Sequence, residues 1–395
     1  MNILIADKLS ATAVEELEGM GATVTFKPDL KADDLPAAVA DAEVLVVRST
    51  RVNRDTIEAA DALSLIIRAG AGVNTIDLEA ASERGIYVTN CPGKNTAAVA
   101  ELAIGLMIGA DRRIPDATKD LREGKWLKKE YGKARGLKGR TLGILGFGAI
   151  GRAVAERAQG LDMEVLAWSR SLTPAIAEVA GIHYAADPTE IAARSDVVSV
   201  HLAMTLDTKH MVDRAFFEGM KAGAVFVNTS RGDIVDTEAL RWAVENRGIR
   251  AAVDVFENEP SGGEDVFDQT DLAGRLVATP HIGASTEQAA EAIAAEVVAI
   301  VHSFAETGHP KNCVNLQEKS PAQHNLVVRH FNRVGVLAGV LDELRAAGVN
   351  IEEMENVIFD GGRAATCSLK LDSKPGDDTV ERIRTSENVI RARLT

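Results

Sequence analysis

Short runs of β-branched and aliphatic residues alternate along the chain with Ala- and Glu-rich segments that carry apolar residues at helical spacing. In residues 1–94 the segment Ala11–Glu18 shows the helical spacing most clearly. Strands that alternate with helices in this way predict a parallel sheet with helices on both faces. The strands expected in this part are Ile3–Ala6, Thr23–Phe26, Val44–Arg48, Leu65–Arg68 and Tyr87–Thr89.

A second alternating series begins at Thr141, and it predicts a second parallel sheet. Its expected strands are Thr141–Leu145, Glu164–Trp168, Asp196–Val200, Ala224–Asn228, Arg250–Val255 and Arg275–Thr279. Two long apolar helices bracket the series, one beginning near Asn95-Thr96 and the other near Ser285-Thr286, and these polar residues can cap them. A helix on each side allows the chain to leave one lobe, build another and return.

We therefore expect two doubly wound α/β lobes with a cleft between them, which is the expected site. Residues 1–94, completed by 282–312, would form a flavodoxin-like lobe, and residues 95–281 would form a Rossmann-like lobe. Residues 313–324 are polar, without helical period, and indicate a linker. Residues 325–395 restart as β-α-β-β-α-β, which predicts a small ferredoxin-like α+β domain.

The chain has 58 acidic and 44 basic residues, and its net charge of −14 argues against nucleic acid and anionic membrane as general partners. The N-terminus lacks the pattern of a signal peptide, and the apolar segment Ala97–Ala110 is too short for a bilayer. Cys91, Cys313 and Cys367 are widely spaced, which predicts reduced structural thiols and no metal site. A cytoplasmic location is expected.

A glycine-rich turn, Gly146-Phe147-Gly148-Ala149-Ile150-Gly151, follows a predicted strand and opens a helix. In that context Gly146 makes a tight turn, Gly148 lets the backbone approach a pyrophosphate, and Gly151 lets helix pack on strand. A packing turn without a ligand is the alternative. At the end of the next strand, where an NAD site usually has an acid, stand Ser169 and Arg170. A hydroxyl and a guanidinium suit the 2′-phosphate of NADP, so NAD and NADP both remain open.

Three segments at strand ends of the second lobe carry an arginine, a glutamate and a histidine, namely Arg231, Glu259 and His281. Oxidation of a 2-hydroxy acid needs these three groups. A guanidinium grips the carboxylate, an imidazole accepts the hydroxyl proton, and a carboxylate orients the imidazole. Taken singly, each residue has an ordinary structural explanation, but their joint appearance favours a catalytic set. His201, at the end of another strand, stands alone and is expected to be structural.

With these motifs, residues 1–315 resemble the D-isomer-specific 2-hydroxyacid dehydrogenase family. The resemblance implies that residues 1–94 bind substrate and residues 95–281 bind NAD(P). It assigns Ala149 and Ile150 to the pyrophosphate, Thr229 to the cofactor and Asp254 to the nicotinamide carboxamide. The segments Val47–Arg51 and Ala69–Asn74 resemble the substrate loops of phosphoglycerate dehydrogenases, although an acid is usual where Asn74 stands. The substrate residues implied are Arg48, Ser49, Gly72, Val73 and Asn95.

The tail resembles an ACT domain, the module with which bacterial phosphoglycerate dehydrogenases bind serine. Its ligand positions fall on His330, Asn332 and Asn350, and amide side chains can satisfy an amino acid. Val334 departs from the usual proline. A tail that only mediates oligomerisation is the alternative.

The expected reaction is oxidation of 3-phosphoglycerate at C2 to 3-phosphohydroxypyruvate, the entry to serine synthesis. One alternative is a glyoxylate or hydroxypyruvate reductase, favoured by Ser169-Arg170, and one from another class is an NAD(H)-sensing regulator. The resemblance implies a homodimer or homotetramer.

Overall fold

The computed structural model describes residues 1–260, 266–317 and 320–395. The chain forms two compact units, Met1–Asn315 and Leu316–Thr395. Within the described residues, the first unit holds a five-stranded and a seven-stranded parallel sheet, and the second holds a four-stranded antiparallel sheet. This confirms the predicted fold class of two Rossmann-like lobes and a small α+β domain.

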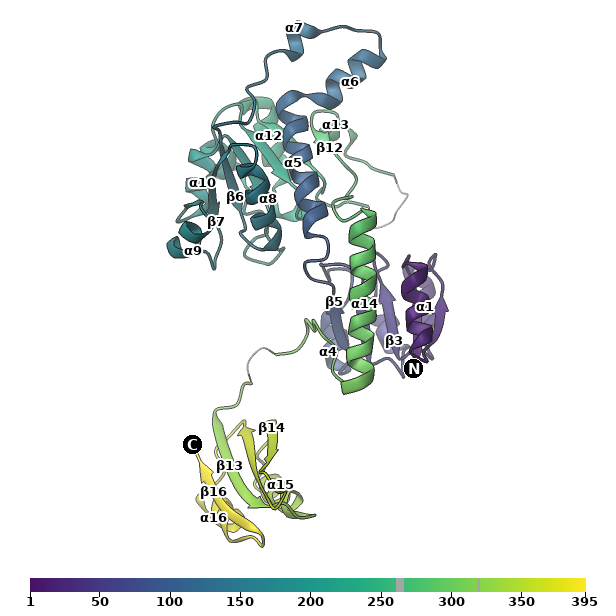
Figure 1. The fold of residues 1–395 in the computed structure, drawn as a ribbon, viewed down its shortest axis with the longest axis vertical. Helices are drawn as coiled ribbons and strands as arrows, with labels where there is room; N and C mark the ends of the chain where they lie inside the picture. The colour runs from purple at the N-terminus through teal and green to yellow at the C-terminus, as the bar shows by residue number, and fades with distance from the viewer. Residues whose placement is uncertain (261–265, 318–319) are drawn as a thin grey trace. The chain divides into compact units, whose positions relative to one another are not determined.

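The first sheet has the order β2-β1-β3-β4-β5, the flavodoxin-like order in which the chain changes winding direction between β1 and β3. Its strands are β1 (Asn2–Ile5), β2 (Thr23–Phe26), β3 (Val44–Val47), β4 (Leu65–Arg68) and β5 (Tyr87–Asn90). On one face lie η1 (Ala32–Asp34), α2 (Leu35–Ala38), α3 (Arg54–Glu58) and α4 (Leu78–Glu83). On the other face lie α1 (Ala11–Gly19) and, from far along the chain, α14 (Glu287–Thr307) (Figure 1).

Helix α14 is long and apolar enough, by length and composition alone, to cross a membrane. Its apolar side chains Ile293, Val297, Ile300 and Val301 are instead buried against the first sheet. Thr286 caps the helix by accepting a hydrogen bond from the amide of Ala289. The helix is therefore part of the core of the first lobe.

The second sheet has the order β12-β11-β10-β9-β6-β7-β8 and changes winding direction between β6 and β9. Its strands are β6 (Thr141–Leu145), β7 (Glu164–Trp168), β8 (His183–Tyr184), β9 (Val197–Val200), β10 (Val225–Asn228), β11 (Arg250–Val253) and β12 (Val277–Ala278). One face packs against α5 (Thr96–Arg112), α8 (Ala149–Gln159) and α9 (Pro174–Val179), and the other packs against α10 (Pro188–Arg194), α11 (Arg214–Gly219) and α12 (Thr237–Arg247).

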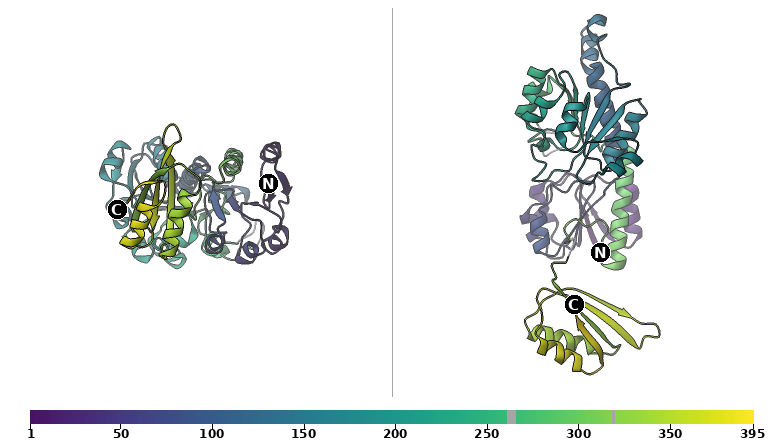
Figure 2. Two further views of the ribbon diagram at one scale, coloured as in Figure 1. Left: turned by 90° about the horizontal axis from the view of Figure 1, so that it is seen from below. Right: turned by 90° about the vertical axis from the view of Figure 1, so that its left-hand side faces the viewer.

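Shorter elements complete the second lobe. They are α6 (Ile114–Arg122), α7 (Lys128–Tyr131), η2 (Gly232–Ile234) and α13 (Thr270–Ala273). Helices α6 and α7 form an arm that extends beyond the sheet, as Figures 1 and 2 show. The arm leaves the lobe beside a buried ion pair, in which Arg140 donates to Asp111 at 2.7 Å.

Residues 312–315 still belong to the first unit. Cys313 forms an isolated antiparallel β-bridge with Thr89, and the amide of Val314 donates to the carbonyl of Val88 at 2.8 Å. The chain leaves this unit after Asn315, within the segment predicted as linker, of which residues 318 and 319 lie outside the described residues.

The tail has the sheet order β14-β15-β13-β16, which is the ferredoxin-like order. Its elements are β13 (His324–Phe331), α15 (Val336–Ala346), β14 (Ile351–Ile358), β15 (Ala364–Leu371), α16 (Asp377–Thr385) and β16 (Val389–Leu394).

Candidate active site

The glycine turn has the geometry of a pyrophosphate cradle. A Cβ at Gly146 (φ 99°) would lie 2.4 Å from the carbonyl oxygen of His201, and one at Gly151 would lie 2.1 Å from the carbonyl oxygen of Gly146. No atom lies within 4 Å of the Cβ position at Gly148, which directly precedes α8. Two glycines therefore allow close backbone packing, while the third leaves an open face at a helix N-terminus, where an anion is favoured.

The residues around this turn fit a dinucleotide. Ala149 and Ile150 form the first turn of α8. Ser169 and Arg170 follow β7, and the Arg170 guanidinium is exposed with no ion pair to any described residue. Thr229, which follows β10, is buried, and its hydroxyl has no hydrogen-bond partner among the described residues. A buried hydroxyl without a described partner, at the same edge of the sheet as an anion-favouring turn, fits a ligand that completes the site.

His201 lies at the end of β9 and has a structural partner. Its Nε2 lies 2.8 Å from the hydroxyl of Ser199. Burial lowers the pKa of His201 to about 4, so its ring is neutral at physiological pH.

Arg231 follows β10 and reaches across to the first lobe. Its Nη1 donates to the carbonyl of Ser230 at 2.6 Å, and its Nη2 occupies the space where Gly72 has no side chain, 2.1 Å from the position of a Cβ. Burial lowers the pKa of Arg231, and the charge of Glu259 opposes that shift. The structure thus brings together Arg231, Glu259 and the predicted substrate loop at Gly72.

His281 and Glu259 form a direct pair. The ring Nδ1 of His281 lies 2.5 Å from Glu259 Oε1, which leaves Nε2 for a substrate. His281 has φ 52°, in the left-handed region that few non-glycine residues adopt, and such a backbone needs support from its surroundings. The arrangement can accept a proton at Nε2 while the carboxylate holds the ring.

Asp254 supplies that support. Its buried carboxylate accepts hydrogen bonds from the hydroxyl of Thr279 at 2.5 Å and from the amides of Ile282 and Gly283, each at 2.8 Å. Burial raises the pKa of Asp254, although these three donors act in the opposite direction. The residue predicted to bind the carboxamide therefore holds the Thr279 side chain before His281 and the backbone directly after it. Its contact with a nicotinamide stays a prediction.

Asp7 organises the predicted substrate loop in the first lobe, a role that the sequence did not reveal. Its carboxylate accepts from the amides of Arg48 at 2.7 Å, Ser49 at 3.2 Å and Thr50 at 3.0 Å. The hydroxyl of Ser49 also donates to Asp7, at 3.0 Å. One carboxylate thereby fixes the loop from which Arg48 extends.

A cavity of about 320 Å³ opens beside Arg48, at the end of the first sheet where β1 and β3 part. Lys8 and Arg48 line it with positive charge, and Glu287 and Glu291 line it with negative charge. No ion pair joins these four side chains to any described residue. Ligands of open α/β sheets bind at such a point.

Arg68, the last residue of β4, was not predicted as a site residue. Burial and the neighbouring charges of Arg231 and Arg48 lower the pKa of Arg68 to about 10. Its Nε is buried without a hydrogen-bond partner among the described residues, and its Nη1 fills the Cβ position of Gly70 at 1.6 Å. Three guanidinium groups thus converge, although the three arginines are distant in sequence.

The other predicted substrate residues are peripheral to these contacts. Val73 is half-buried against the core of the first lobe. Asn95 directly precedes α5 as predicted, but its side chain makes no capping hydrogen bond. Asn74 Oδ1 lies 3.1 Å from the Cβ position of Gly72.

The three predicted tail ligands do not converge within one copy of the domain. His330 is buried, with contacts to the carbonyl of Phe331 at 2.8 Å and to Asn356 at 3.3 Å, and Asn332 donates to the carbonyl of Gly362 at 3.0 Å. Asn350 lies before β14 and donates to Glu352 at 2.8 Å. Residue 351 pairs opposite residue 371 of β15 and residue 330 pairs opposite residue 365, so the two ends are about 20 Å apart.

The fold and the site together define a two-lobed α/β protein with a dinucleotide-binding turn and an Arg-Glu-His set. Residues 104–283 match the family model of the D-isomer specific 2-hydroxyacid dehydrogenase, NAD binding domain. The chain belongs to the D-isomer specific 2-hydroxyacid dehydrogenase family and has its NAD(P)-binding domain.

Curated relatives of this chain carry different enzyme names. The chain is 39% identical over 318 residues to a D-3-phosphoglycerate dehydrogenase of Methanocaldococcus jannaschii. The aligned region covers 80% of this chain and 60% of that protein. It is 35% identical to the D-3-phosphoglycerate dehydrogenase of Archaeoglobus fulgidus, over 95% of this chain and 68% of that one. It is also 40% identical to a hydroxypyruvate reductase of Thermotoga maritima, over 74% of this chain and 95% of that one.

Solved structures are similar to this chain over about four fifths of its length. The NAD+-bound 3-phosphoglycerate dehydrogenase of Entamoeba histolytica is 30% identical with a TM-score of 0.67, covering 80% of this chain and 99% of that one. An acyclic imino acid reductase in complex with NADPH and D-Arg is 25% identical with a TM-score of 0.70, over 80% of this chain and 100% of that one. Both cofactors therefore occur among the structural relatives.

Proposed function

We propose that this chain is a cytoplasmic NAD(P)-dependent dehydrogenase that oxidises 3-phosphoglycerate at C2 to 3-phosphohydroxypyruvate. The observation that carries the choice of substrate is the convergence of Arg48, Arg68 and Arg231. A plain 2-hydroxy acid has one carboxylate, which a single guanidinium satisfies. Two further cations in a partly buried place favour a second anionic group, and a phosphate is the group that arginines hold best.

In this reaction Arg231 binds the substrate carboxylate, and His281 accepts the C2 hydroxyl proton at Nε2. Glu259 holds Nδ1 of the imidazole and stabilises the imidazolium that forms. A bound nicotinamide dinucleotide would supply the hydride acceptor, positioned by the glycine turn, by Thr229 and by Ser169 or Arg170. The hydroxy acid loses a hydride from C2 and a proton from oxygen, and it becomes the 2-oxo acid.

The choice of substrate is tested by Arg68→Gln, with Arg84→Gln as the matched control. Arg84 lies at the outer end of α4 and forms an exposed ion pair with Asp61. One lost charge-assisted contact corresponds to about 1.5–3 kcal/mol. We therefore expect kcat/KM for 3-phosphoglycerate to fall by roughly 10- to 150-fold, with a much smaller loss for glycerate, which lacks the phosphate. Equal losses for both substrates would remove phosphate binding from Arg68.

A second candidate is an NADP-dependent glyoxylate or hydroxypyruvate reductase. The exposed guanidinium of Arg170 after β7, which forms no ion pair with the residues that the structure describes, favours it. That position faces the 2′-substituent of the adenosine ribose in dinucleotide-binding lobes. Comparison of kcat/KM for 3-phosphoglycerate, hydroxypyruvate and glyoxylate, each with NAD(H) and NADP(H), distinguishes the two candidates.

For the tail we propose an assembly role, since one copy does not bring His330 and Asn350 together. Light scattering of the whole chain and of residues 1–315 tests it, and a tail-dependent dimer or tetramer is expected. The alternative, feedback inhibition by serine bound to the tail, predicts heat of binding in a calorimeter. It also predicts a lower rate of the dehydrogenase reaction at millimolar serine. If neither is observed, the assembly role alone remains.

A further inference from the structure

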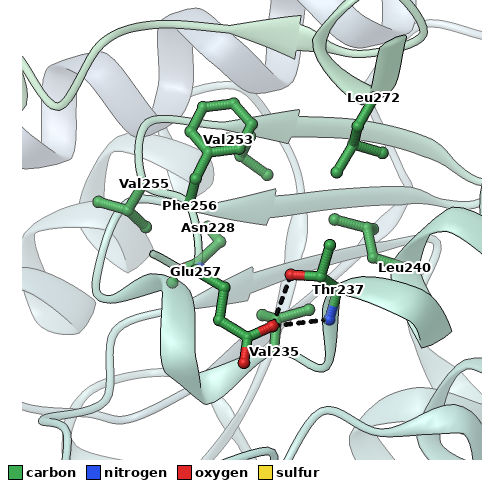
Figure 3. A pocket seen from close by; sticks show the side chains of 10 residues that line it. Asn228, Val235, Thr237, Leu240, Val253, Val255, Phe256, Glu257 and Leu272 are labelled. Atoms are coloured by element: carbon green, nitrogen blue, oxygen red, sulfur yellow. Dashed lines mark hydrogen bonds between the residues drawn. The ribbon is translucent and has the colours of Figure 1, made fainter. Parts of the chain in front are cut away.

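Two glutamates lie in the loop after β11, and only the second, Glu259, takes part in the proposed proton transfer. Glu259 pairs with His281, whereas Glu257 points away toward the N-terminus of α12 (Figure 3). The carboxylate of Glu257 is mostly buried, with 19% of the side chain exposed. Burial of a carboxylate costs free energy unless hydrogen bonds or charges compensate, so the partners of Glu257 indicate its role.

The carboxylate of Glu257 has three donors or partners. Its Oε2 accepts from the hydroxyl of Thr237 at 2.6 Å and from the amide of Thr237 at 3.2 Å. Its Oε1 lies 2.6 Å from Nε2 of His210. Burial alone would raise the pKa of Glu257, but the hydrogen bonds from Thr237 and His210 outweigh it and hold this pKa below the ordinary value. The group is therefore an anion with its partners in place.

Both partners are fixed to the segment that begins at Arg231. Thr237 starts α12, a few residues after Arg231. The amide of His210 donates to the carbonyl of Asp233 at 2.9 Å, and the amide of Val212 donates to the carbonyl of Ile234 at 3.0 Å. Glu257 thus ties the loop that carries Glu259 to the segment that carries Arg231.

The two segments also cross at one point with almost no space between them. A Cβ on Gly232 would lie 2.0 Å from the backbone carbon and oxygen of Phe256. This contact fixes the separation of the segments but leaves the loop free to turn about it. Residues 257–260, which follow the crossing, form no helix or strand, and Asn258 has φ 55°. The side-chain amide of Gln269 donates to the carbonyl of Glu257 at 2.6 Å. The side-chain bonds of Glu257 supply the second point at which the loop is attached to the segment that carries Arg231.

We infer that Glu257 is a positioning residue, which sets the orientation of Glu259 and His281 relative to Arg231 through its bonds to Thr237 and His210. The inference rests on the proposed function, because it presumes that these three residues act on one substrate. Loss of the second attachment lets the loop rotate about the Gly232–Phe256 crossing. The carboxylate of Glu259 then meets His281 at a changed angle, and the proton acceptor is misplaced.

The test compares Glu257→Ala and Glu257→Gln with a matched control, Glu190→Ala, in the full-length protein. Glu190 is also a partly buried carboxylate, which accepts from the amide of Ala186 at 2.9 Å and from Arg194, but it lies on α10. We expect Glu257→Ala to lower kcat by about 10- to 100-fold, since displacements near 1 Å have that effect. The KM for the cofactor and the Tm should stay close to those of Glu190→Ala. Glu257→Gln retains one acceptor oxygen for Thr237 and should recover a large part of kcat.

A second readout needs no turnover. The Nδ1–H proton of His281, bonded to Glu259, should give a downfield proton NMR signal that is identified by its loss in His281→Ala. We expect the signal to shift or broaden in Glu257→Ala and to stay in place in Glu190→Ala. An unchanged signal, or a loss of kcat no greater than the loss of folded protein, overturns the positioning role. A different result would contradict the proposed function itself: a wild-type protein that oxidises no 2-hydroxy acid and reduces no 2-oxo acid.

Discussion

The space at Gly72 allows a prediction that separates activity from stability. In Gly72→Ala the new methyl group would lie 2.1 Å from Nη2 of Arg231, and the guanidinium must retreat by about 1.3 Å to reach an ordinary contact at 3.4 Å. An error of 1 Å in a substrate-positioning group costs about 100-fold in rate, or about 2.7 kcal/mol of transition-state binding. We therefore expect kcat/KM to fall by roughly 100-fold, mostly through a higher KM for the hydroxy acid.

The same substitution should leave the fold intact. Gly72 does not have a positive φ, and the atom it would displace is the end of a flexible side chain. Alanine at such a position adds about 0.4–1 kcal/mol by restricting the unfolded chain, so Tm should stay the same or rise.

The assay is steady-state oxidation at several substrate concentrations, together with thermal unfolding followed by circular dichroism. Gly105→Ala is the control, because Gly105 lies within α5 with no atom near its Cβ position, and it should keep full activity. An active Gly72→Ala enzyme, or one whose loss of activity follows a lowered Tm, would refute the placement of Arg231 against this loop.

Three further predictions concern single contacts. In Asp254→Asn, the amide group cannot accept from both backbone N–H donors that follow His281, those of Ile282 and Gly283. We therefore expect about 1.5–3 kcal/mol less transition-state stabilisation, measured as a 10- to 150-fold lower kcat/KM in a protein that still unfolds cooperatively. In Asp111→Ala, Arg140 is left as a buried charge without its carboxylate. Urea unfolding should show a free energy of unfolding lower by about 3–5 kcal/mol. A decrease below about 1 kcal/mol would mean that water reaches the guanidinium. Arg170→Ala should weaken NADP binding by about 1.5–3 kcal/mol and leave NAD unaffected, and equal effects on both cofactors would remove Arg170 from 2′-phosphate recognition.

Local patterns predicted most of the fold. The apolar runs of Leu65–Arg68 and Glu164–Trp168 are strands with those same bounds in the structure, because a buried parallel strand requires such a run. The glycine turn, with a strand before it and a helix after it, was equally clear. By contrast, the two-residue strand β8 and the arm of α6 and α7 were not predicted, since neither has a long apolar period.

The parts of the site that were not predicted depend on sheet order. Asp7 acts on residues 48–50 because β1 lies beside β3, and no local pattern contains that adjacency. Arg68 is the last residue of β4, and its local sequence gives no sign of a site. The two arginines near it, Arg48 and Arg231, follow two other strands. In the tail, His330 and Asn350 each occupy a position typical of a ligand, but the register of the sheet places them at opposite ends.

The position of α14 in the chain has a consequence for biosynthesis. Five strands of the first lobe are complete at Asn90, but α14, one of the two helices that cover one face of them, begins only at Glu287. At about 5–20 residues per second, a ribosome needs roughly 10 to 40 s to add the intervening residues. During that time the apolar side chains of Ile3, Ile5 and Val44 lack the part of their cover that α14 supplies. The inserted lobe can fold meanwhile, so the nascent chain should complete its second lobe before its first, and chaperones should engage the uncovered sheet early in synthesis.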